Sequence, residues 1–215
     1  MEKGKIFIQI ASYRDSELIP TIDDAIKNAK YPENLIFAIN NQYHPDDKFR
    51  DLKKYRSDPR FKIIDTMYTN SKGACWARNA IQQLYDNEEY TLQLDSHHRF
   101  AKDWDAELIK ELKKLQKKGY KKPMLTGYIP SYDPKDDPKS RIDVPWYMNF
   151  DRISPDGNVH FLPASVDDFK ERSEPIPARF YSAHFCFTLG SFAKEVQHDP
   201  EYYFHGEEIS IGVRA

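Results

Sequence analysis

Cysteine is scarce in this chain of 215 residues, because only Cys75 and Cys186 occur and they form no CxxC pair. This scarcity excludes a disulfide-based scaffold and a cysteine-rich zinc site, and it suits a reducing cytoplasm. Long apolar runs are also missing: the longest uncharged one, Ile6 to Ala11, is far shorter than the roughly 20 residues that span a bilayer. No secretory signal is visible in the residues before it. We therefore expect a cytoplasmic protein without a transmembrane segment.

An excess of basic residues is missing as well. The chain has 32 Lys and Arg against 34 Asp and Glu, which gives a net charge of −2 and argues against a nucleic-acid partner. Residues 110–122 hold seven lysines, but leucines occupy the opposite face of the expected helix. We interpret this segment as a solvated helix face and not as a binding patch for RNA or a membrane.

Aromatic side chains, by contrast, are abundant. They make up 14% of the sequence, with 14 Tyr, 13 Phe and 3 Trp. Such a content indicates either an aromatic core or a surface that stacks on planar or ring-shaped ligands.

Apolar runs alternate with helical patterns in the first half of the chain. Strand-like runs occupy residues 5–11, 35–40, 61–67 and 90–94, and helical patterns occupy 18–29, 46–57, 70–86 and 101–118. Repeated strand–helix–strand units predict an α/β fold, with a mostly parallel central sheet flanked by helices. Ligands of such sheets bind at the carboxyl ends of the strands.

The second half of the chain has a different composition. Residues 120–180 contain nine of the 14 prolines together with many aromatic residues, which predicts a long ordered excursion with short strands. A strand over 183–189, a short helix from Ser191 and a last helix opened by residues 205–208 follow. We expect one domain over residues 1–215, and further natural sequence beyond Ala215 because the last helix has only begun there.

The most specific motif is Leu94-Asp95-Ser96-His97, where a buried strand ends in an acid, a small residue and an imidazole. In extended backbone, residues two positions apart point the same way, so Asp95 and His97 can share one divalent cation. Mixed carboxylate and imidazole ligands suit Mn²⁺ (or Mg²⁺) and leave positions open for phosphate oxygens. The alternative is that Asp95 caps the next helix and His97 is an exposed loop residue.

Ser12-Tyr13-Arg14-Asp15 ends the first strand, at the edge where ligands of open α/β sheets bind. Tyr13 can stack on a base, Asp15 can accept hydrogen bonds from base or ribose, and Arg14 can reach phosphate. The alternative is a strand-to-helix turn in which Ser12 or Asp15 caps the helix.

Two further motifs could face the same crevice. In Lys72–Asn79 (KGACWARN), Gly73 and Ala74 permit close backbone approach and Arg78 could reach a ligand, although an ordinary amphipathic helix with a solvated Arg78 is equally compatible. In His205-Gly206-Glu207-Glu208, the glycine would let a sugar approach two carboxylates, which a helix start favours whatever their function. The two cysteines lie in apolar runs without an activating base, so we interpret both as inert core thiols.

Together, the segments IASYRD, KGACWARN, LQLDSHHRF and YFHGEEIS resemble those of the hydroxyproline polypeptide N-acetylglucosaminyltransferases, the GT-A-fold enzymes of glycosyltransferase family 60. The D-S-H triplet is also similar to that of the polypeptide N-acetylgalactosaminyltransferases, which share the fold and the retaining outcome. The resemblance implies a UDP-sugar donor with Mn²⁺ on Asp95 and His97. It also implies a third metal ligand, a histidine, after the GEE-like helix and beyond Ala215.

The resemblance further implies where each part of the donor binds. Base and ribose would lie near Ser12, Tyr13, Arg14 and Asp15, with Arg78 and Ser96 on the nucleotide side. Glu207 and Glu208 would lie near the donor sugar, as the candidate catalytic residues.

Several functions therefore compete. The first is a metal-dependent retaining glycosyltransferase that moves N-acetylglucosamine from UDP-GlcNAc to a hydroxyl of a protein or glycan, which agrees with the lack of a placed nucleophile. The second is an inverting transferase with Glu207 or Glu208 as general base. The third is a non-catalytic carbohydrate- or nucleotide-binding module. The fourth is an RNA-binding domain, which the near-neutral net charge does not favour.

Overall fold

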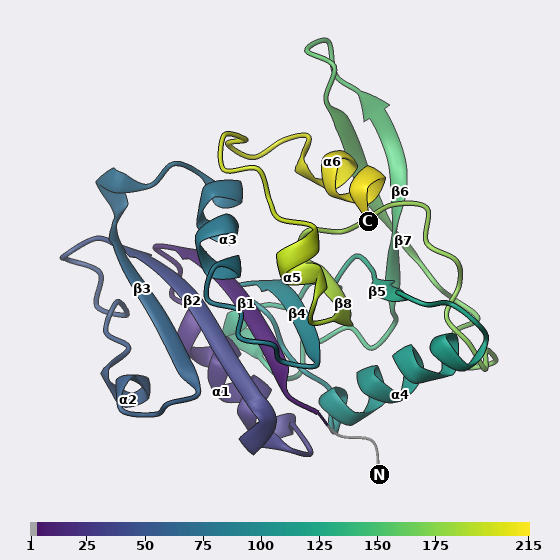
Figure 1. Cartoon of the computed structure of the whole chain (residues 1–215), viewed down its shortest axis with the longest axis horizontal. Coiled ribbons are helices and arrows are strands. Elements are labelled where there is room, and N and C mark those ends of the chain that lie inside the picture. The colour runs from purple at the N-terminus through teal and green to yellow at the C-terminus, as the bar shows by residue number, and fades with distance from the viewer. Residues whose placement is uncertain (1–3) are drawn as a thin grey trace.

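The computed structural model describes residues 4–215 and shows a six-stranded sheet with helices on both faces (Figure 1). The strand order is β3-β2-β1-β4-β8-β5. These strands are β1 (Ile6–Tyr13), β2 (Leu35–Tyr43), β3 (Phe61–Met67), β4 (Tyr90–Asp95), β5 (Met124–Thr126) and β8 (Phe185–Leu189). Strands β1 to β4 pair in parallel, and β8 runs antiparallel to both β4 and β5. The predicted mostly parallel central sheet is confirmed.

Six α-helices and three short 3₁₀ turns surround this sheet in the part of the chain that the structure describes. The helices are α1 (Leu18–Asn28), α2 (Lys53–Arg56), α3 (Ala74–Gln82), α4 (Trp104–Lys117), α5 (Phe192–Glu195) and α6 (Glu207–Arg214). The 3₁₀ turns are Pro32–Asn34, Tyr68–Asn70 and Pro134–Asp136. None of the helices in residues 4–215 combines the length and apolar composition needed to cross a bilayer.

Both faces of the sheet are covered because successive side chains of a strand point to opposite faces. On β1, Ile6, Ile8 and Ile10 are buried in the cluster that includes side chains of α1 and α4. Phe7 points the other way and packs in a second cluster with side chains of α3 and α5. This two-sided burial explains why the strands read as continuous apolar runs.

Two predicted helices are shorter than expected. The helix predicted over 70–86 occupies only Ala74–Gln82, since Tyr68–Asn70 forms a 3₁₀ turn and Gly73, with φ +105°, is the residue before the helix. The polar stretch 46–57 is helical only over Lys53–Arg56. In both cases the remaining polar residues form the loops and turns that follow β2 and β3.

Residues 120–180 contain β5 and a separate two-stranded sheet. Strands β6 (Trp146–Ile153) and β7 (Val159–Ser165) form an antiparallel hairpin that rises beyond the carboxyl ends of the main sheet (Figure 1). A single antiparallel bridge between Tyr128 and Trp146 ties the hairpin to the segment that follows β5. The predicted short strands are thus present, and the hairpin lies beside α6 (Figure 1).

The carboxyl ends of β1 and β4 lie side by side, because Ala11 pairs in register with Asp95. The amino ends of α3 and α6 meet above them, where the backbone N–H of Ala74 donates to the carbonyl oxygen of Tyr203 at 3.0 Å. Gly73 allows this approach: a Cβ at this position would lie 2.4 Å from the Tyr203 oxygen. Segments distant in the sequence therefore converge at one edge of the sheet.

Candidate active site

The loops after β1 and β4 are joined by hydrogen bonds among predicted site residues. The Ser96 hydroxyl donates to Oδ2 of Asp15 at 2.6 Å, and Nδ1 of His97 lies 2.8 Å from the same oxygen. Burial raises the pKa of Asp15, but the hydrogen bonds from His97 and Ser96 outweigh it and lower that pKa to about 2. Asp15 is therefore an anion at neutral pH, and its hydrogen bond raises the pKa of His97.

Asp95 and His97 are placed so that one cation can touch both. Oδ2 of Asp95 and Nε2 of His97 are 4.0 Å apart, slightly less than two metal–ligand bonds of about 2.1 Å each. The oxygen and nitrogen donors match the preferences of Mn²⁺. The side chain of His97 is 59% exposed and that of Asp95 is 32% exposed, so the pair remains open to a ligand. Within residues 4–215, no third His, Cys, Asp or Glu donor completes a group with this pair.

The backbone of the D-S-H turn is held by two residues that the sequence interpretation did not include. The hydroxyl of Thr21, on α1, donates to the carbonyl oxygen of Ser96 at 2.8 Å and accepts the N–H of His98 at 2.9 Å. Nδ1 of His98 lies 3.0 Å from the carbonyl oxygen of Asp95, and burial lowers the pKa of His98 to about 4. The sequence could have indicated His98, because it is the second histidine of the DSHH segment, but nothing in the sequence marks Thr21.

Arg78 connects Asp95 to α6. Its Nη2 donates to Oδ1 of Asp95 at 2.9 Å and its Nη1 donates to Oε1 of Glu207 at 2.6 Å. Burial lowers the pKa of Arg78, but the charges of Glu207 and Asp95 outweigh it and raise that pKa. The alternative of a solvated Arg78 is wrong, because this side chain is 6% exposed. The guanidinium ion also occupies Oδ1 of Asp95 and leaves Oδ2 for a cation.

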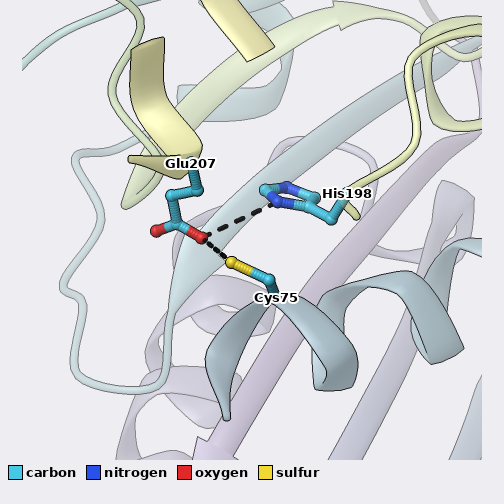
Figure 2. Close-up of side chains that lie close together, drawn as sticks. All are labelled: Cys75, His198 and Glu207. Atoms are coloured by element: carbon cyan, nitrogen blue, oxygen red, sulfur yellow. Dashed lines mark hydrogen bonds and ion pairs between the residues drawn. The ribbon is translucent and has the colours of Figure 1, made fainter. Parts of the chain in front are cut away.

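Glu207 is anchored by both of its carboxylate oxygens. Besides Arg78 on Oε1, the Cys75 thiol donates to Oε2 at 2.7 Å, and Nδ1 of His198 lies 3.8 Å from Oε2 (Figure 2). Burial and the Glu207 charge raise the pKa of Cys75, in agreement with an inert core thiol, and burial likewise raises that of Cys186.

Cys75, His198 and Glu207 offer three donor atoms within 4.8 Å of one another, which prompts the question of a second metal site. A structural zinc site needs four ligands, whereas this group has three members among the described residues. The guanidinium of Arg78 also contacts Glu207 and would repel a cation. This group therefore serves as a hydrogen-bonded support for Glu207.

Glu208 differs from its neighbour. Its Oε1 accepts the backbone N–H of Ala183 at 2.9 Å, and burial raises its pKa to about 7. Glu208 can therefore exchange a proton near neutral pH, whereas Glu207 is fixed between Arg78 and Cys75.

Two cavities meet at Arg78 and Asp95. The first has a volume of about 420 Å³ and lies over the ends of β1 and β2; among its lining residues are Tyr13, Asp15, Gln42, His97, Tyr203 and Phe204. The second has a volume of about 200 Å³ and lies between the hairpin and α6; its lining includes His160, His184, His205, Glu207 and Glu208. The loop that carries Phe204 borders both cavities, and sequence reasoning found no role for Gln42, Tyr203 or Phe204.

The predicted residues of the first strand end separate into two sets. Tyr13, whose side chain is 54% exposed, and Asp15 line the first cavity. Arg14 instead forms an ion pair with Asp47 at 2.9 Å and does not line this cavity. Ser12 is buried in the sheet, and its carbonyl oxygen accepts from Gln42.

Comparison with solved structures defines the class of fold. GalNAc-T7, crystallised with UDP, GalNAc and Mn²⁺, matches 98% of this chain with a TM-score of 0.64 at 17% identity, and the match covers 40% of that protein. TarS of S. aureus matches 98% of this chain with a TM-score of 0.60 at 13% identity, over 34% of its own length. This chain therefore spans less than half of either protein, and the likeness confirms the predicted GT-A-type fold.

The family follows from the sequence. The profile of the family described as Glycosyltransferase (GlcNAc) matches residues 5–59 and 48–215, so the chain belongs to this glycosyltransferase family. No curated protein matches the sequence at a significant level.

Proposed function

We propose that this protein is a metal-dependent retaining glycosyltransferase that transfers N-acetylglucosamine from UDP-GlcNAc to a hydroxyl of a protein or glycan. The observation that carries the proposal is the Asp95–His97 pair, whose facing donor atoms are 4.0 Å apart at the meeting point of two cavities. Family membership supports glycosyl transfer and N-acetylglucosamine as the sugar.

The first cavity suits the nucleotide. Its volume of about 420 Å³ lies within the range of small-molecule sites, and Tyr13 and Tyr203 offer exposed rings for stacking on a base. Asp95 and His97 would hold Mn²⁺, which when bound neutralises the charge that develops on the departing diphosphate. Arg78 adds a permanent positive charge beside Asp95 and supports the same leaving group.

The second cavity suits the donor sugar and the acceptor. Glu207 and Glu208 border it from α6, and His160 and His205 add polar groups that can bond to sugar hydroxyls. GalNAc-T7, whose fold this chain shares, was crystallised with UDP, GalNAc and Mn²⁺, which supports a nucleotide-sugar donor here.

The free buried thiols support the proposed cytoplasmic location. Since β5 and β8 of the second half complete the main sheet, we also propose one domain over 1–215.

An inverting transfer is the second candidate. Its support is Glu208, because a base with a pKa of about 7 matches neutral working conditions, whereas both oxygens of Glu207 are occupied by Arg78 and Cys75. The anomeric configuration of the product decides between the two mechanisms.

The experiment is Mn²⁺-dependent turnover of UDP-GlcNAc by the full-length protein and its variants. We expect Asp95→Ala and His97→Ala to lower turnover by about 100-fold or more, since each removes a direct ligand of the cation. Asp46→Ala is the control, because this carboxylate is 91% exposed and lies outside both cavities. Full metal-dependent activity in both site variants would contradict the proposal. Intact UDP binding without any turnover by the unmodified protein would favour the non-catalytic module.

A further inference from the structure

We propose that Asp15 is a positioning residue that holds the His97 ring so that Nε2 faces the metal site. This inference rests on the proposed function, since it concerns the same Asp95–His97 pair. Its basis is one contact: Oδ2 of Asp15 lies 2.8 Å from Nδ1 of His97, on the side of the ring opposite to Asp95.

The contact fixes which ring nitrogen carries the proton. A neutral imidazole has one N–H donor and one lone pair, and a carboxylate can only accept. The hydrogen must therefore lie on Nδ1 and point at Asp15, which leaves the lone pair on Nε2. Nε2 is 4.0 Å from Oδ2 of Asp95, a distance that is too long for a hydrogen bond and suits a cation shared by the two atoms. Histidine ligands of metals commonly donate their other N–H to a carboxylate in this way.

Asp15 is itself held firmly enough to impose this orientation. Its Oδ1 accepts the backbone N–H of Glu17 at 2.8 Å, and its Oδ2 also accepts the Ser96 hydroxyl at 2.6 Å. Both oxygens are thus engaged by the protein, just before α1 begins. This arrangement favours a role toward His97 over the contact with base or ribose that the sequence suggested.

The two metal ligands are oriented by the same principle. Arg78 occupies Oδ1 of Asp95 and Asp15 occupies Nδ1 of His97, so each ligand presents its remaining donor atom to the other. His97 depends more on its partner, because its side chain is 59% exposed and little packing restrains the ring.

The substitution Asp15→Asn tests the inference with little change in shape. The Glu17 N–H requires the amide oxygen, so the amide N–H₂ turns toward His97 and stabilises the tautomer with the proton on Nε2. We expect the Mn²⁺ affinity of the nucleotide-free protein, measured by electron paramagnetic resonance, to fall about 10- to 100-fold. Asp46→Asn makes the same change of charge at a carboxylate that is 91% exposed, and it should leave the affinity unchanged.

Two further measurements separate positioning from other roles. Nitrogen-15 NMR of the metal-free protein should show the proton of neutral His97 on Nδ1, and on Nε2 in Asp15→Asn. In His97→Ala, adding Asp15→Asn should cause no further loss of Mn²⁺ affinity, because Asp15 acts through the ring. Additive losses would overturn the inference. A loss of UDP affinity in Asp15→Asn, measured in EDTA, would also overturn it, because it would show that Asp15 contacts the nucleotide.

The outcomes also distinguish this inference from the proposed function. If Asp95→Ala and His97→Ala leave Mn²⁺ binding intact, the metal site itself is wrong and both proposals fail. If those variants lose the metal but Asp15→Asn binds it normally, only the positioning role fails.

Discussion

The strand ends around Asp95 and the hairpin β6–β7 border the same site but are built differently. Around Asp95, charged side chains are held by other parts of the chain: Asp15 by Ser96 and His97, and Arg78 by Asp95 and Glu207. On the hairpin, large apolar side chains face outward instead, with Phe150 at 47%, Ile153 at 64% and Leu162 at 53% exposed.

This difference separates two tasks. In the proposed function a cation and a diphosphate would need donors held in place before they bind, and the polar network at the strand ends fits that need. In the proposed function the acceptor would contact the exposed apolar side chains of the hairpin, which need no fixed geometry for this. The comparison predicts that substitutions at the strand ends cost stability, whereas those on the hairpin do not.

The largest effect is expected at Arg78, which holds both Asp95 and Glu207 in the polar network at the strand ends. Arg78→Met leaves Asp95 and Glu207 facing each other without a counter-charge, and Glu207 is only 7% exposed. Breaking one partner out of a buried ion pair costs about 3–5 kcal/mol, so we expect a loss of that size in urea unfolding.

A double substitution tests the cause of that loss. In Arg78→Met/Glu207→Gln the unpaired buried charge is gone, and the loss should be clearly smaller than the sum of the two single losses. Simple additivity would mean that the Arg78 side chain matters for its packing and that the ion pair contributes little. Arg172→Met is the matched control: in its ion pair with Asp168 the two side chains are 42% and 53% exposed, and the pair should contribute within about 1 kcal/mol.

The next effect compares one leucine from each region. Leu92 on β4 is fully buried in the main core cluster, and Leu92→Ala should cost about 2–5 kcal/mol because it leaves a cavity. Leu162→Ala on β7 should change the free energy of unfolding by no more than about 0.5 kcal/mol. Equal losses in the two variants would show that the hairpin is as tightly packed as the sheet.

Local patterns in the sequence predicted the sheet and part of the site. The first four strands coincide with the apolar runs of the sequence. Asp95 ends the buried strand β4 and His97 follows two positions later, so local backbone geometry alone predicts that the two side chains point the same way. The GT-A-type fold was predicted correctly as well.

The remaining contacts depend on how distant segments meet. Arg78 and Glu207 are 129 positions apart and touch only because the segment around Tyr203 crosses over Gly73. The pairing of Asp15 with His97 likewise requires the neighbouring ends of β1 and β4. No periodicity encodes which carboxylate a given cation will contact, so the sequence alone predicts neither the Asp15–His97 contact nor the Arg78–Glu207 contact.

The smallest effect concerns Glu208, where a buried acid at the hairpin side makes stability depend on pH. Burial raises its pKa to about 7 in the folded protein from 4.5, so the folded state holds the proton more tightly than the unfolded state. Stability is therefore greatest below the unfolded pKa and is lost as the pH rises through about 7. We expect Glu208 to account for a loss of about 2 kcal/mol between about pH 5 and pH 7.

Glu208→Gln keeps the acceptor for the Ala183 N–H and should remove this dependence, whereas Glu171→Gln, at an exposed position, should retain it. Urea unfolding at a series of pH values gives the answer, and parallel pH profiles for Glu208→Gln and the unmodified protein would mean that the pKa of Glu208 is the same in the folded and the unfolded protein.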